Sequence, residues 1–361
     1  MSAIYELLGM SREERVMVNT VGENVLYEKA AQVVAMHQME LDRAYSVFVE
    51  RTTEAYSERY KLAGSGRLQR RGGQTQSAVV RGQEGWDVAY PLEQFGEQIA
   101  GDRHQMGYST MRDLDLALDT VMNQNIGTVR YELLRSLFNN TARSFNDPWA
   151  RTPTLTIQPL ANGDAVEYPP IRGTDTMATA DHYRASGYAS AAISNTNDPV
   201  VESIDALQEY FGAVTGGSQV VVFHNSAETG AIEGLDATKD IPDRFITVGA
   251  NNDSANMGFP QVPGKVWARH SRGAWICEWQ WIPAGYTVAI FIGAEKPLLK
   301  RVHPAETGLS RGLSLIRGTS DKYPFSQAHY EHDFGFGVAN RLNGFVMQLT
   351  AGAYAVPTDY A

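Results

Sequence analysis

The sequence predicts an α+β protein, because segments with helical periodicity alternate with short runs that are typical of strands and turns. The clearest helix runs from Met111 to Phe138, where apolar residues recur every three or four positions. After Pro148 the chain becomes a series of short apolar runs separated by Gly, Asn, Asp and Pro, which favours strands and turns. With 361 residues, the chain is long enough for roughly two or three domains and a large buried core.

The composition is that of an ordinary globular protein. Thirty-one basic and forty-one acidic side chains give a net charge of -10, so the chain as a whole is not expected to bind nucleic acid by charge. A single cysteine, Cys277, excludes an internal disulfide and suits a reducing compartment. The first residues lack the pattern of a secretion signal, and no apolar run approaches the ~20 residues that cross a bilayer. We therefore expect synthesis in the cytoplasm and no membrane partner.

A basic loop is predicted after an N-terminal amphipathic helix. The helix is expected from Asn24 to about Tyr60, on a segment that is otherwise charged. The stretch from Gly64 to Gln83 is rich in Gly and Gln and contains no acid. Its basic residues are Arg67, Arg70, Arg71 and Arg81. So long a connection is uncommon in a compact domain unless it is functional or covered by a partner. The preceding segment has an excess of acids, so we expect the loop of one copy to lie on the acidic body of another.

The long helix has a start signal and one weak point. Thr110 and Asp113 form a capping-box pattern, while Gly127 costs ~1 kcal/mol relative to Ala and predicts a bend. A second helix is expected to begin around Asp198 and Pro199 and to be followed by a buried strand. Further strands are expected at "TLTIQPL", "RFITVG", "KVWARH", "AWICEWQWI", "TVAIFIG", "GLSLIRG" and "GFVMQLTAGAYAVP".

The segment "HYEHD" is a candidate metal site, formed by His329, Glu331, His332 and Asp333. A zincin-type site needs H-E-x-x-H on a helix, but the glycines that follow favour a strand, which places His332 on the face opposite the other three. We therefore expect no metal and interpret these residues as the polar end of a strand, bonded to the backbone or to a neighbouring subunit. At such a contact His329 and His332 would titrate near pH ~6–7.

A second candidate is the GxSxG pentapeptide around Ser310, with Asp321, His332 and Asp333 downstream in hydrolase order. A nucleophile elbow requires a buried strand before the serine and a helix after it, whereas here a strand-like segment follows. No phosphate-binding motif is complete either. We therefore assign no catalytic residue and no cofactor. A metal-dependent or serine hydrolase that uses these residues is the less favoured alternative.

The order of parts resembles a known family. A helical arm, a long loop, "WDVAYPLEQFG", a long helix ending in "LFNNT", an α+β middle and "FGFGVANRLNGFVMQL" are similar to the major capsid proteins of tailed bacteriophages with the Hong Kong 97-type fold. The resemblance covers most of the chain from about Gly64 onward. It implies a shell subunit whose extended loop lies over a neighbour.

The resemblance also implies a division of the chain. The expected parts are an N-terminal, largely helical arm (1–61), an extended loop (62–89), a peripheral domain (90–197) with a spine helix (110–140), an axial domain (198–302) and a return to the peripheral domain (303–361), with 335–349 crossing its sheet. On this division Arg67, Arg70, Arg71, Arg81 and Trp86 would contact a neighbouring subunit. No lysine lies between Leu62 and Ile99, so the lysine–asparagine cross-link of the founding member is not expected. The arm is short, so we expect no proteolytic removal of a scaffolding segment.

The implied partners are other copies of the chain, in pentamers and hexamers, together with a portal protein and scaffolding or decoration proteins. The shell would assemble in the host cytoplasm, become the virion capsid and enclose double-stranded DNA without reading its sequence. The net negative charge suits this role, because an acidic inner surface lets packaged DNA slide. The alternative on the same fold is an encapsulin-like bacterial compartment that packages an enzyme.

Overall fold

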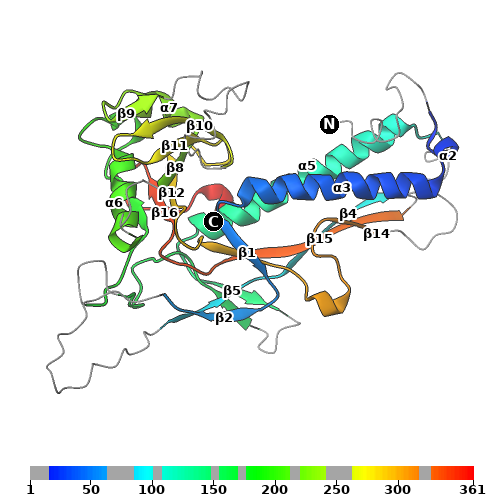
Figure 1. Ribbon diagram of the computed structural model, residues 1–361, viewed down its shortest axis with the longest axis horizontal. Helices are drawn as coiled ribbons and strands as arrows, with labels where there is room; N and C mark the ends of the chain where they lie inside the picture. Colours follow the sequence, from blue (N-terminus) through cyan, green and yellow to red (C-terminus); the bar gives the residue numbers. More distant parts are fainter. Residues whose placement is uncertain are drawn as a thin grey trace, which may run out of the picture.

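The structure is a computed structural model that describes residues 16–62, 85–100, 108–147, 154–169, 176–211, 220–240, 262–316 and 327–361. Two long helices lie side by side along one end of an elongated molecule, and a rounder lobe with two shorter helices forms the other end (Figure 1). The α+β class predicted from the sequence is confirmed. The α-helices are α2 (Val18–Val21), α3 (Glu23–Tyr45), α5 (Met111–Phe138), α6 (Pro199–Phe211) and α7 (Ser226–Glu233).

A five-stranded sheet lies beneath the helix pair. Its strands are β1 (Val49–Thr53), β13 (Leu298–Arg301), β15 (Gln327–Val338), β14 (Ser314–Ile316) and β4 (Glu93–Ala100). The twelve-residue β15 is central: β4 pairs with it along one side, and β13 and β14 pair with it along the other. Strand β1 pairs in parallel with β13 at the margin. The sheet therefore joins two segments from the first third of the chain to three segments near its end.

A seven-stranded sheet forms the rounder lobe. In spatial order its strands are β7 (Tyr183–Ala185), β16 (Phe345–Gln348), β12 (Tyr286–Phe291), β8 (Val220–His224), β11 (Trp275–Glu278), β10 (Lys265–His270) and β9 (Thr238–Asp240). Every residue of β8 is buried, as expected for a central strand covered on both faces. Helices α6 and α7 cover one face. Two small ribbons complete the described strands, β2 (Ser57–Tyr60) with β3 (Trp86–Ala89), and β5 (Arg143–Asn146) with β6 (Thr154–Ile157).

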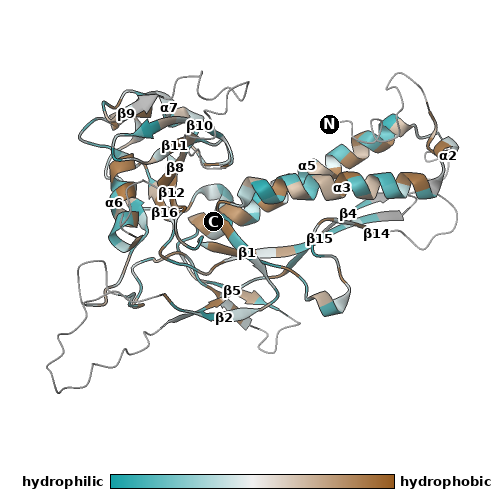
Figure 2. Cartoon of the chain, viewed as in Figure 1, coloured by the Kyte–Doolittle hydropathy of each residue, from teal (hydrophilic) through white to brown (hydrophobic). Residues whose placement is uncertain are grey.

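One apolar core connects the two sheets. The second face of the seven-stranded sheet packs on the C-terminal half of α5 and on the turn after α3. Phe48 from that turn lies 5.1 Å from the ring of Phe223 and 5.3 Å from that of Trp279, measured between centroids. Apolar residues concentrate on the lobe's strands and alternate with polar ones along α3 and α5, as Figure 2 shows. The two ends of the molecule are therefore held by continuous burial of apolar surface.

Helix α5 confirms the predicted long helix. Its bounds match the expected ones, and the Thr110 side chain accepts a bond from the Asp113 backbone while the Asp113 carboxylate accepts one from the Thr110 backbone. Such reciprocal bonds satisfy two amides that a helix start leaves without partners. The helix continues through Gly127, where a methyl group would enter open space.

The structure corrects the predicted N-terminal helix. The helix ends at Tyr45 instead of continuing to about Tyr60, and the residues beyond it form β1 and β2. Two physical reasons explain the difference: the segment "VFVERTT" is rich in β-branched residues, and β13 offers it a parallel partner. Because β13 lies far along the chain, the local sequence pattern of this segment could not predict the pairing.

A second correction concerns residues 335–349, which were expected to cross one sheet. Gly335 to Val338 complete β15, but after a turn Phe345–Gln348 form β16 of the seven-stranded sheet. The turn is built by side chains, since the Asn343 amide donates to the carbonyls of Phe291 and Glu295. Gly344 has a φ of 144°, which a residue with a Cβ rarely adopts.

Most of the other predicted strands agree with the structure, and one lies outside the described residues. "TLTIQPL", "KVWARH", "AWICEWQWI", "TVAIFIG" and "GLSLIRG" each contain a strand, and "GFVMQLTAGAYAVP" contains one only at its beginning. The segment "RFITVG" lies outside the described residues. In the described part of the chain, no helix is both long enough and apolar enough to cross a membrane.

Candidate assembly surface

A small ribbon of two paired strands flanks the segment in which the loop is predicted. In the β2–β3 pair Tyr60 lies opposite Trp86, so the chain leaves the ribbon and returns to it at paired residues. The Arg59 guanidinium lies 3.2 Å from the Asp87 carboxylate across the ribbon, although both groups are exposed and contribute little. The ribbon is therefore a base from which the intervening segment starts and to which it returns.

Trp86 fixes this base to the core of its own chain. The indole is 5% exposed, and its Nε1 donates to the carbonyl of Ala339 at 3.1 Å. Its ring lies 5.1 Å from the rings of both Tyr60 and Tyr168. Of the predicted contact residues Trp86 alone is described, because Arg67, Arg70, Arg71 and Arg81 lie outside the described residues. Its burial shows an anchoring role, and its expected contact with a neighbouring subunit stays a prediction.

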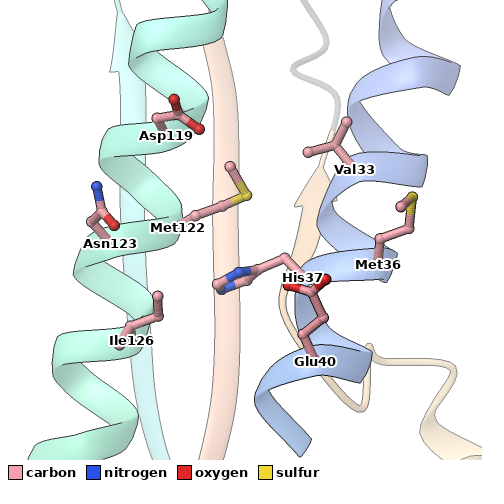
Figure 3. Close-up of a pocket in the computed structure, with 8 residues that line it drawn as sticks. All are labelled: Val33, Met36, His37, Glu40, Asp119, Met122, Asn123 and Ile126. Carbon is pink, nitrogen blue, oxygen red and sulfur yellow. The ribbon is translucent and has the colours of Figure 1, made fainter. Parts of the chain in front are cut away.

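The second candidate surface is the outer side of the helix pair. Met36 and Met39 on α3 are half or more exposed, and so is Leu116 on α5. Between the helices lies a cavity of about 170 Å³. Its lining residues are Val33, Met36, His37, Glu40, Asp119, Met122, Asn123 and Ile126. Figure 3 shows His37 extending from α3 toward α5, with Met122 and Ile126 on the facing helix. Exposed apolar side chains with acids at their edge suit a contact with another protein chain.

A second groove lies on the other side of α5. It has a volume of about 310 Å³ and is lined by residues of α5, β4 and β15 together with Leu313. Tyr330 and His332 form part of its wall, and both side chains are almost fully buried. The Tyr330 hydroxyl and the His332 Nε2 have no hydrogen-bond partner among the described residues. Two polar atoms are therefore buried behind the groove wall without a hydrogen-bond partner among the described residues.

The segment "HYEHD" lies within β15 and not at its end. Strands β4 and β14 pair with it on both sides, so the strand continues through these residues without interruption. As predicted, the strand separates His332 from the other three candidates: His332 is 2% exposed, whereas Glu331 is exposed on the opposite face. Among the residues that the structure describes, no three His, Cys, Asp or Glu side chains are grouped so that they could hold a metal ion.

Burial makes His332 unsuitable as a sensor near neutral pH. Desolvation lowers its pKa to about 2, and the positive charge of Lys300 and the neighbouring His37 act in the same direction. The expectation that His332 titrates near pH ~6–7 at a subunit contact is therefore wrong. The sequence shows alternation along the strand, but it does not show that α5 covers this face.

His332 is held by a bridging amide. Its Nδ1 donates to Oδ1 of Asn125 on α5 at 2.7 Å, and Nδ2 of the same amide donates to Nε2 of His37 on α3 at 3.3 Å. One amide thus connects both helices and the central strand. Burial lowers the pKa of His37 below its ordinary value, and the nearby Glu40 carboxylate opposes that shift.

A buried lysine lies near the bridge formed by His37, Asn125 and His332. Lys300 on β13 is 2% exposed, its Nζ donates to the hydroxyl of Tyr45 at 2.9 Å, and Asp42 is 3.6 Å away. Burial lowers the Lys300 pKa, while Asp42 opposes the shift. The contacts among Lys300, Tyr45 and Asp42 therefore link the end of α3 to the five-stranded sheet.

Two further polar anchors were not predicted from the sequence. Arg341, fully buried, donates from Nε to the Pro159 carbonyl at 2.7 Å and from Nη2 to Asp164 at 2.9 Å. Glu132 of α5 lies between Arg135 and Arg143, and burial raises its pKa. A polar residue inside an apolar run is the one signal that could have marked Glu132. Arg341 links the turn before β16 to the loop after β6, and Glu132 links α5 to β5.

The geometry around Ser310 is not that of a nucleophile elbow. The serine follows a single 3-10 turn (Ala305–Thr307), precedes β14 and is exposed. Its hydroxyl donates to the Gly312 carbonyl at 2.8 Å. His332 is committed to Asn125, the Asp333 carboxylate to His303 at 2.8 Å, and Asp321 lies outside the described residues. These groups form local structural bonds, and no catalytic function is indicated.

The described residues form an elongated molecule with a helix pair on a sheet, a second sheet lobe and a small ribbon of β2 and β3. The chain shares its fold with a solved structure described as "Mycobacterium phage Patience": the TM-score is 0.65 and the identity 22%, over 97% of both chains.

Two further solved structures are less similar. The capsid of a native GTA particle gives a TM-score of 0.47 at 15% identity, over 85% of this chain and 90% of that chain. The capsid of the cyanophage P-SCSP1u gives 0.46 at 11% identity, over 84% and 86%. No family model matches the sequence, and no curated protein matches it.

Proposed function

We propose that this chain is the major capsid protein of a tailed bacteriophage, which assembles into an icosahedral shell around double-stranded DNA. The observation that carries the proposal is the fold shared with a phage structure over 97% of both chains. The order of parts along the sequence supports the same role, since it resembles that of the Hong Kong 97-type capsid family.

In the proposed shell, copies of the chain form pentamers and hexamers. The segment between β2 and β3 lies over a neighbouring copy, and Arg67, Arg70, Arg71 and Arg81 meet its acidic surface. The ribbon supports this arrangement because Trp86 fixes its base in the core, so that a contact made by the segment acts on the whole subunit. Burial between subunits offsets the entropy lost on ordering a long loop.

The finer assignments follow from the same proposal. A portal protein and scaffolding or decoration proteins are the expected partners, and assembly takes place in the host cytoplasm. The net charge of -10 supports enclosure of DNA without adhesion to it. The enclosed material distinguishes this role from an enzyme-packaging compartment.

Nuclease protection tests what the shell encloses. Particles are isolated from cells that carry the gene in its natural context, treated with DNase and then opened. The proposal predicts protected double-stranded DNA of uniform length and no stoichiometric enzyme. Shells that contain a folded enzyme and no protected DNA would favour the compartment instead.

A further inference from the structure

The bridge between His37, Asn125 and His332 has a defined hydrogen-bond direction. A carbonyl oxygen only accepts, so the short contact from His332 Nδ1 to Asn125 Oδ1 places the His332 proton on Nδ1. An amide nitrogen only donates, so His37 accepts from Asn125 through a bare Nε2. Both imidazoles are neutral in this arrangement, and the Asn125 amide bonds to the two rings through its oxygen and through one N–H of its amide nitrogen.

The bridge spans two surfaces of the molecule. His37 lines the cavity between α3 and α5, while Asn125 and His332 line the groove between α5 and β4. His332 Nε2 is buried at that groove without a partner among the described residues. A change in the protonation of His37 on α3 can therefore reach His332 beside the groove through the single amide of Asn125.

We propose that these three residues form a proton-sensitive relay, in which protonation of His37 reverses the Asn125 amide and shifts the His332 proton from Nδ1 to Nε2. A proton on His37 Nε2 would face the Asn125 Nδ2–H group, and two donors repel. Turning the amide over brings Oδ1 to His37 and Nδ2 to His332. His332 must then accept through Nδ1, so it releases that proton to water and takes one up on Nε2, and it stays neutral throughout.

The surrounding charges favour His37 as the group that takes up the proton. Glu40 lies on its own helix, and Asp119 of α5 lines the same cavity. His332 is deeply buried and faces the positive charge of Lys300 from β13, while Tyr330 of β15 and Glu97 of β4 line its groove. A half-buried imidazole beside acids accepts a proton before a buried one beside an ammonium group.

The relay changes the hydrogen-bond character of the His332 nitrogen that does not face Asn125. With neutral His37, Nε2 is bare and lies buried behind the groove wall, without a partner among the described residues. With protonated His37, the same atom carries a hydrogen and becomes a donor. The relay therefore sets whether this buried nitrogen accepts or donates a hydrogen bond.

Histidine nitrogen NMR tests the relay directly. The full-length chain is labelled with ¹⁵N at histidine, and both ring nitrogens of each histidine are followed from about pH 7.5 to about pH 4.5, on either side of the ordinary histidine pKa. The relay predicts that the His332 pattern changes from the Nδ1–H to the Nε2–H tautomer with the midpoint of the His37 titration. An unchanged His332 tautomer across a complete His37 titration overturns the proposal, and so does protonation of His332 itself.

Internal and matched controls keep the result interpretable. His182 is also buried and donates from Nδ1 to the Gly344 carbonyl at 2.6 Å, so its tautomer should not change. The Asn125→Leu variant removes the amide but keeps a similar volume. In this variant His37 should still titrate, and the His332 tautomer should stay the same throughout that titration. A coupled change that persists in Asn125→Leu would show that the amide is not the link. The wild-type measurement decides the proposal even where this variant fails to fold.

Discussion

At the scale of single residues, two glycines of β15 decide how closely the chain can pack. A Cβ on Gly337 would lie 2.7 Å from the Ala89 carbonyl oxygen and 2.7 Å from the Tyr90 ring, and a Cβ on Gly335 would collide with the Pro91 carbonyl. The backbone after β3 therefore passes directly over the strand, which only glycine permits.

Gly337→Ala is expected to destabilise the subunit by ~1–3 kcal/mol, because the added methyl must displace backbone and not a flexible side chain. Gly127→Ala is the matched control, since its methyl enters open space on α5 and should stabilise the helix by up to ~1 kcal/mol. Urea unfolding of the two variants measures the sign and the size of the change in the free energy of unfolding for each. Equal and small changes in the stability of both variants would contradict the close approach of the backbone at Gly337.

Buried histidines make the folded chain sensitive to acid. Burial lowers the pKa of His182 to about 4 and that of His332 to about 2, and it also lowers the pKa of His37 and His224. A histidine held neutral in the fold takes up its proton on unfolding. Its contribution to stability is therefore complete above pH ~6.5 and declines as the pH falls toward the lowered pKa.

We expect the free energy of unfolding to fall below pH ~6.5, by up to ~1.4 kcal/mol per pH unit for each such histidine. The raised pKa values of Glu132, Glu202 and Glu228 act in the opposite direction but involve fewer groups than the four histidines. His182→Asn keeps a donor for the Gly344 carbonyl and removes the titrating ring, so its stability should depend less on pH between ~6.5 and ~4. Denaturant unfolding across this range measures the slope, and an identical slope in the variant would refute the assignment.

At the scale of elements, the ribbon and its loop are expected to act between subunits. Changing Arg67, Arg70, Arg71 and Arg81 together to Ala should leave the subunit folded, because its described core and the Trp86 anchor do not use them. Assembly should weaken, since the contact with an acidic surface is lost, and the wild type should approach the variant as salt screens that contact.

Sedimentation of assembled and free chain over a series of salt concentrations measures this effect. Arg59→Ala is a suitable control, because it removes one exposed cation from the ribbon itself and leaves the loop unchanged. Shell yield and thermal stability that are equal in wild type and the fourfold variant would show that the arginines do not contribute to assembly.

At the scale of the whole molecule, local signals predicted the elements better than their partners. The capping residues and apolar stripe determined α5, and the runs of β-branched and other apolar residues determined β8 and β12. The end of α3 was wrong because β1 depends on β13, far along the chain. The crossing of residues 345–348 into the second sheet depends on the Asn343 bonds, which no local pattern contains. The polar bridge at Asn125 was missed for the same reason, since three distant elements build it.

The central claim, that the chain is a shell subunit, is tested most directly by electron microscopy of the purified full-length protein expressed alone. A capsid subunit with the fold seen here should form closed, hollow particles of uniform diameter with icosahedral symmetry. Discrete particles of one or a few subunits, under conditions in which the chain is folded and concentrated, would contradict the claim.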